Sequence, residues 1–165
     1  MSSSDTGVNI ESDSVCPESG FPVFCESKWL DVSFRKESNY KITTKLIGDN
    51  ILLVETSGFG YLEDLKPALE FTKTIIDEKF PDGTKYVRME NLINFKGISS
   101  DARAYYASLM AKNEPLLGLI YFNVPYLIKT SIYLGMKFGL VPFSIQLAST
   151  YNDAMLRAMR LLRKL

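Results

Sequence analysis

The spacing of apolar residues predicts a β-hairpin near the start of the folded part. Apolar residues alternate with polar ones over 40–46, and a second apolar run covers 51–54 after the turn at 48–50. This pattern is typical of two antiparallel strands, of which the second is the more deeply buried. A shorter strand is expected just before the hairpin, over 29–34.

After the hairpin, helical and strand patterns alternate to the end of the chain. An apolar stripe at helical spacing runs from Leu62 to Phe80, and Pro81-Asp82-Gly83 ends it. Strands are then expected over 86–90, 116–122 and 143–148, and helices over 100–112, 126–138 and 152–165. Such alternation requires right-handed crossovers and predicts a parallel arrangement. The fold class is therefore α/β: a mixed, mainly parallel sheet with an N-terminal β-hairpin, then repeating αβ units, packed with about four helices.

The first 27 residues differ in composition from the rest. They contain no lysine or arginine and few large side chains, and their acidic residues are Asp5, Glu11, Asp13, Glu18 and Glu26. Such a segment buries too little apolar area to offset the entropy lost on ordering. We expect a disordered acidic tail over 1–27 and a single domain over 28–165.

Charge and hydropathy exclude several classes of partner. The charges of the 19 basic and 19 acidic residues cancel. The basic cluster 157–164 is explained by its place at the C-terminal end of a helix, where positive charge is favourable. The sequence therefore does not indicate binding to nucleic acid. The uncharged stretches 115–128 and 138–152 fall short of the ~18 apolar residues of a membrane-spanning helix. We expect no membrane insertion. The polar, acidic start of the chain does not resemble a secretory signal, which predicts a cytoplasmic location.

Residue types also limit the chemistry. The chain has no histidine, which removes the commonest general base and metal ligand, and Cys16 and Cys25 form no zinc set. We expect no catalytic residue, no metal and no cofactor.

The acidic residues of the 62–80 helix, Asp64 among them, are expected on a solvated face. Ser57-Gly58-Phe59-Gly60 lacks the third glycine and the lysine of phosphate loops, so its glycines serve backbone geometry.

The segment 95–103 leaves a strand and opens a helix. Ser99 or Ser100 is expected to cap the free amides there, with Asp101 favourably placed in the first turn. A β-hairpin followed by αβ units, with a serine pair capping the helix after the strand that ends in Glu90, resembles the STAS domain family. That family includes sulphate transporter cytoplasmic domains and anti-sigma factor antagonists, and the resemblance covers residues 38–165.

The segments 91–103 and 116–125 are similar to STAS-like domains that precede PAS and kinase modules in bacterial sensor histidine kinases. The resemblance implies a non-catalytic, cytoplasmic regulatory domain of two-component signal transduction. Its partner would be another protein or a downstream kinase domain. The pattern is still helical at Leu165, which is compatible with a further domain, and a homodimer is left open.

In the antagonist branch of the STAS family, a partner kinase phosphorylates the second serine of the pair. By position that serine is Ser100, with Ser99 as its neighbour, but Ile98 and Asp101 depart from the family pattern. A phosphate on Ser100 would be repelled by the carboxylate of Asp101, which favours docking over a phospho-switch. The expected interaction surface consists of Lys96, Ser99, Ser100, Asp101 and Arg103.

A small-ligand sensor is the alternative hypothesis, since ligand sites are mostly apolar with a few polar groups. The aromatic residues that would line its pocket are Tyr105, Tyr106, Tyr121, Phe122, Tyr126 and Tyr133. Ordinary core packing is the competing explanation for these side chains.

Overall fold

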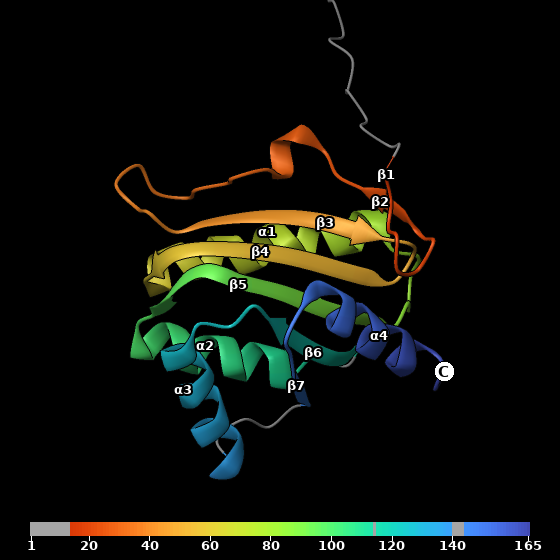
Figure 1. Cartoon of the computed structure of the whole chain (residues 1–165). Coiled ribbons are helices and arrows are strands. Elements are labelled where there is room, and N and C mark those ends of the chain that lie inside the picture. Colours follow the sequence, from red (N-terminus) through yellow and green to blue (C-terminus); the bar gives the residue numbers. More distant parts are fainter. Residues whose placement is uncertain (1–13, 114, 140–143) are drawn as a thin grey trace, which may run out of the picture.

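A mixed sheet forms the centre of the computed structural model, which describes residues 14–113, 115–139 and 144–165. Within these residues seven strands pair in the order of the sequence (Figure 1). The strands are β1 (Ser14–Val15), β2 (Pro22–Phe24), β3 (Lys41–Ile47), β4 (Ile51–Gly60), β5 (Tyr86–Ile98), β6 (Leu116–Phe122) and β7 (Ile145–Ala148). Neighbours from β1 to β4 are antiparallel, and those from β4 to β7 are parallel.

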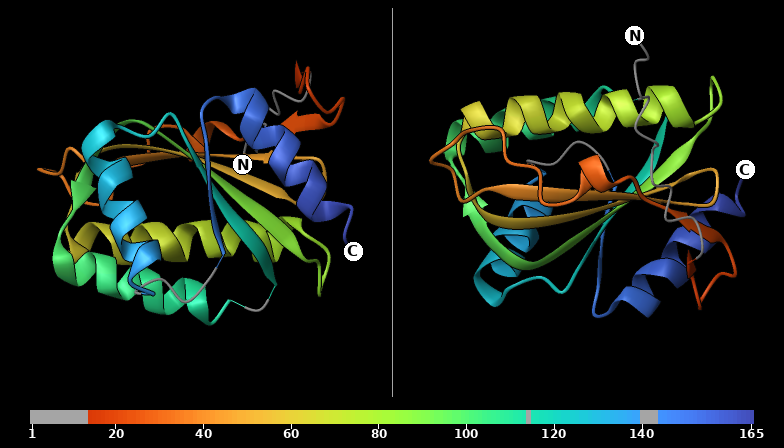
Figure 2. Two further views of the ribbon diagram at one scale, coloured as in Figure 1. Left: turned by 60° about the horizontal axis from the view of Figure 1, so that its bottom comes forward. Right: turned by 90° about the horizontal axis from the view of Figure 1, so that it is seen from above.

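Helices cover both faces of the sheet. They are the short 3₁₀ helix η1 (Ser27–Trp29) and the α-helices α1 (Leu62–Lys79), α2 (Ser100–Ala111), α3 (Tyr126–Lys137) and α4 (Tyr151–Leu162). α1 and α2 lie on one face, and α4 packs on the other (Figure 2). None of the helices in the described part of the chain combines the length and apolarity that crossing a membrane requires. The expected α/β class, a hairpin followed by αβ units, is confirmed.

Strand β4 shows why the apolar run 51–54 is continuous. Leu52 and Val54 pack under α1 and α2, whereas Ile51 and Leu53 pack on the opposite face with Met155 of α4. Successive side chains of a strand point to opposite faces, so a strand covered on both sides is apolar at every position.

The N-terminal segment is part of the fold from Ser14 onward. β1 pairs with β2, and β2 pairs with β3. Cys16 is 1% exposed, with its Sγ 3.2 Å from Tyr151 Oη. Glu26 is also buried, and its carboxylate lies 2.9 Å from Lys28 Nζ and 2.8 Å from Lys79 Nζ. The expected tail over 1–27 therefore does not extend through residues 14–27, and residues 1–13 lie outside the described residues.

Two strand predictions differ from the structure. The segment 29–34 is not a strand. η1 occupies its start, and its one bridge to another described residue joins Val32 to Ile42. Asp31 has φ +48°, which interrupts an extended backbone. β5 runs on to Ile98 instead of ending at residue 90, because β4 continues beside it to Gly60 with shifts in register.

Helix α1 begins without a serine, threonine or asparagine cap. Asp64 in its first turn accepts the backbone N–H of Tyr61 at 3.0 Å, and Arg35 binds both Asp64 oxygens, at 2.6 and 2.7 Å. Burial disfavours the charged Asp64, but these hydrogen bonds outweigh burial and lower its pKa. The prediction that Asp64 lies on a solvated face is wrong, because its partner Arg35 comes from a distant loop.

Candidate functional site

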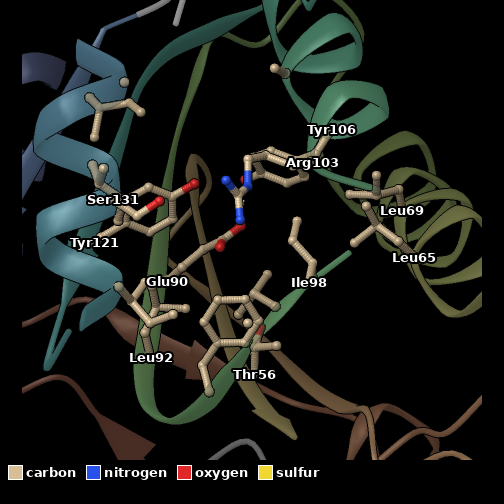
Figure 3. Close-up of a pocket in the computed structure, with 18 of the residues that line it drawn as sticks. Thr56, Leu65, Leu69, Glu90, Leu92, Ile98, Arg103, Tyr106, Tyr121 and Ser131 are labelled. Atoms are coloured by element: carbon tan, nitrogen blue, oxygen red, sulfur yellow. Dashed lines mark hydrogen bonds between the residues drawn. The ribbon is translucent and has the colours of Figure 1, made fainter. Parts of the chain in front are cut away.

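A cavity of about 370 Å³ lies between the sheet, α1, α2 and α3 (Figure 3). It persists because α3 is not packed tightly onto the sheet: none of its described residues is buried. Most of its lining is apolar. The apolar residues that contribute to it include Leu65, Leu69, Leu92, Phe95, Ile98, Ile128, Ile132 and Phe138.

A polar cluster, made of Arg88, Glu90, Tyr106 and Tyr121, interrupts this apolar lining. Arg88 and Glu90 are two residues apart on β5, so both side chains point to the cavity face of the sheet. Arg88 is 4% exposed and Glu90 is 6% exposed. Figure 3 shows the side chains of Glu90, Tyr106 and Tyr121 directed toward one another.

The polar cluster is held by short contacts. Arg88 Nε donates to Glu90 Oε1 at 2.5 Å, and Tyr106 Oη donates to the same oxygen at 2.8 Å. The guanidinium carbon of Arg88 lies 5.9 Å from the centre of the Tyr106 ring. Burying two charges costs several kcal/mol, and such pairing and added hydrogen bonds are what offset that cost.

Electrostatics favour the charged form of Arg88 and the neutral forms of the two tyrosines. Burial disfavours the charge on Arg88, but the Glu90 carboxylate outweighs burial and raises the pKa of Arg88 above its ordinary value. Burial, and then the negative charge of Glu90, raise the pKa values of Tyr106 and Tyr121. The cluster thus presents a neutralised ion pair and neutral hydroxyls, groups suited to binding a polar atom.

Arg103 contributes a further charge at the solvent-exposed edge of the cavity. Arg103, Tyr106 and Ala107 line it at i, i+3 and i+4 of α2, a spacing that places them on one helix face. Arg103 is exposed, and its side chain makes no ion pair or hydrogen bond with another described residue. Across the cavity, α3 contributes Ser131 (Figure 3).

The structure brings together two of the six aromatic residues expected in a pocket. Tyr106 and Tyr121 line the cavity. Tyr105 lines a second cavity, of about 600 Å³, between α1 and α2. Phe122 packs on the opposite face of the sheet against Tyr151, with ring centres 5.8 Å apart.

The other two aromatics, Tyr126 and Tyr133 of α3, are 81% and 53% exposed. Adjacent residues on a strand or helix point in different directions, which separates Phe122 from Tyr121 and Tyr105 from Tyr106. Arg88 and Glu90 were not predicted from the sequence as site residues. Their signal is a pair of charged residues two apart within the segment 86–90, whose other residues are apolar.

The expected interaction surface lies where β5 leads into α2. Ser99 is half-buried, and the four exposed members are Lys96, Ser100, Asp101 and Arg103. Ser99 occupies the N-cap position, but its hydroxyl donates to the Asp101 carboxylate instead of accepting from an amide. That hydrogen bond and one from the Ala102 N–H lower the pKa of Asp101. The prediction that a serine side chain caps α2 is wrong.

These features define a mixed α/β protein with a SpoIIAA-like sheet, an arrangement that is STAS-like. The solved structure of an uncharacterized protein from the DUF3478 family with a SpoIIAA-like fold, from Shewanella loihica PV-4, is similar with a TM-score of 0.54. The two sequences are 13% identical, and the match covers 75% of this chain and 97% of the other. No protein-family model and no curated protein matches this sequence. The STAS-like fold is confirmed, and the kinase context stays a prediction.

Proposed function

We propose that this domain is a non-catalytic regulatory module that binds a small, largely apolar ligand in the cavity beside α3. The observation that carries the proposal is the polar cluster opening into an apolar cavity. Ligand sites in proteins typically have volumes of roughly 300–1,000 Å³, mostly apolar walls and a few convergent polar groups. The cavity of about 370 Å³, with Arg88, Glu90 and Tyr106 at one side, has each of these properties.

Regulation follows from the elements that bound the cavity. A ligand inside it touches the sheet, α1, α2 and α3 together. α3 is held by few buried contacts, so a ligand adds contacts that this helix otherwise lacks. A ligand with different affinity for two positions of a helix shifts the population between them. The exposed apolar residues of α3, such as Tyr126 and Leu127, would carry that shift to a partner.

Blocking the cavity tests this function. The probe is N-phenyl-1-naphthylamine, a neutral apolar dye whose fluorescence rises on binding. We expect saturable binding of one dye per chain, weakened by at least about tenfold in Ser131→Trp, because the indole occupies the cavity. Thr130→Trp is the matched control, since Thr130 is exposed on the same helix and does not line the cavity. No saturable binding to the original protein, or equal binding by both variants, contradicts the proposal.

A second candidate function is docking of a protein partner, or of a kinase domain, at the start of α2. The hydroxyl of Ser100 favours it: Ser100 is exposed and its side chain makes no hydrogen bond with another described residue, while Ser99 is already engaged by Asp101. Ser100 is thus accessible for contact. Phosphorylation of Ser100 is the less favoured version, because Asp101 lies beside it and repels a phosphate.

The docking candidate is tested by quantitative mass spectrometry of proteins that co-purify with the tagged protein from its own host cells. We expect Ser100→Arg to lose a partner that Ser108→Arg retains. Both serines are exposed on α2, but Ser108 lies away from the proposed surface. If the two variants retain the same set of proteins, the docking site is elsewhere. The same spectra report whether Ser100 carries phosphate.

A further inference from the structure

We propose that the ligand is an amphipathic monoanion, such as a medium-chain carboxylate, with its head group on Arg103 and its apolar tail inside the cavity. This inference rests on the proposed ligand-binding function and names the chemical class of the ligand. It is carried by the number, sign and pairing of the charged side chains that line the cavity.

Three charged side chains line the cavity among the described residues: Arg88, Glu90 and Arg103. The first two neutralise each other in a buried ion pair with a 2.5 Å contact. Arg103 is left as a single positive charge. A ligand of complementary charge therefore carries one negative charge, and a cationic ligand would meet an uncompensated arginine.

The pairing of these groups also determines where the anion lies. Glu90 already accepts hydrogen bonds from Arg88 and Tyr106. Its negative charge disfavours a second carboxylate beside it. Arg103 has no competing partner among the described residues and lies at the solvent-exposed edge. Burying an ion without full pairing is costly, so the head group stays at that edge. The planar fork of a guanidinium matches both oxygens of a carboxylate.

The apolar tail fits the interior of the cavity. Its apolar lining includes Leu65 and Leu69 of α1, Ile98 of β5, and Ile128 and Ile132 of α3. Because the burial of each methylene strengthens binding by about fourfold, a chain of several carbons contributes most of the affinity. The charge on Arg103 then discriminates between ligands that have tails of equal length but different head groups.

Displacement of N-phenyl-1-naphthylamine by decanoate and by 1-decanol tests this selection, because the two compounds have equal tails and differ in charge. We expect the original protein to bind decanoate about tenfold more tightly than decanol, as for a charge-assisted hydrogen bond at an accessible site. Arg103→Gln should abolish the preference by weakening decanoate binding, and Arg103→Lys should retain part of it. Lys129→Gln is the control, since Lys129 is an exposed cation of α3 that does not line the cavity.

The outcomes separate this inference from the function on which it rests. If decanoate and decanol displace the dye equally from the original protein, or if Arg103→Gln keeps the preference, the anionic ligand is contradicted while the cavity still binds. If the dye itself does not bind, the ligand-binding function fails instead. A preference that Lys129→Gln removes as strongly as Arg103→Gln reflects general surface charge and also overturns the role of Arg103.

Discussion

Glu90→Leu is expected to lower the free energy of unfolding by about 3–5 kcal/mol, the usual cost of removing one partner of a buried ion pair. Arg88 is 4% exposed, and an arginine stays charged at any ordinary pH, so the variant leaves a buried cation without its counter-ion. Tyr106 also loses the acceptor of its hydrogen bond. Urea unfolding followed by circular dichroism measures the loss.

The double variant Arg88→Leu/Glu90→Leu is the control for that prediction. Replacing a buried ion pair by apolar residues of similar volume is often neutral or stabilising. We therefore expect the double variant to recover most of the stability that Glu90→Leu loses. The single variant Arg88→Leu completes the comparison. If the losses of Glu90→Leu and Arg88→Leu simply add in the double variant, Arg88 and Glu90 are not coupled, and the polar cluster is not held as described.

Gly58→Ala is expected to lower the free energy of unfolding by at least about 3 kcal/mol. Gly58 has φ +76°, in the left-handed region, and an added Cβ would lie 2.0 Å from the backbone oxygen of Asn39. The backbone must move to relieve that contact. The same loop is bound to β4 through Asn39 Oδ1, which accepts the Phe59 N–H at 3.1 Å.

Gly83→Ala separates the cost of the positive φ from the cost of the close contact with Asn39. Gly83 has φ +77°, but no atom of the described residues lies within 4 Å of an added Cβ. We expect it to lose only the ~1–2 kcal/mol of a left-handed non-glycine residue. Thermal and urea unfolding of both variants give the comparison. Equal losses of unfolding free energy in Gly58→Ala and Gly83→Ala would mean that the loop at Asn39 moves away from the added Cβ at little energetic cost.

The helices and central strands could be predicted because each has its own periodicity. The expected helix from Leu62 to Phe80 is observed as α1 over Leu62–Lys79, and the expected strand 116–122 is β6. The N-terminal strands could not be predicted from composition. Cys16 and Glu26 are buried by contacts with Tyr151 and Lys79, which are distant in the sequence.

The candidate site was predicted in smaller part. Tyr106 and Tyr121 were expected in a pocket and line the cavity. The positions of the aromatic residues alone did not indicate which faces of the helices and strands border the cavity. Arg88 and Glu90 have no helical or turn signal, and their roles depend on the register of β5 beside β6. The partner protein, the kinase context, phosphorylation of Ser100 and a cytoplasmic location stay predictions.

The order of the strands in space is also the order in which the ribosome makes them. Each strand therefore has its neighbour available at the moment of synthesis, and the sheet can grow from β1 toward β7 as the chain emerges. The face under α4 is different, because Ile51, Leu53, Val87 and Met89 are covered only when Tyr151–Leu162 has been made. Apolar surface that is transiently exposed during folding promotes aggregation. The nascent chain therefore exposes this apolar face until α4 has been made.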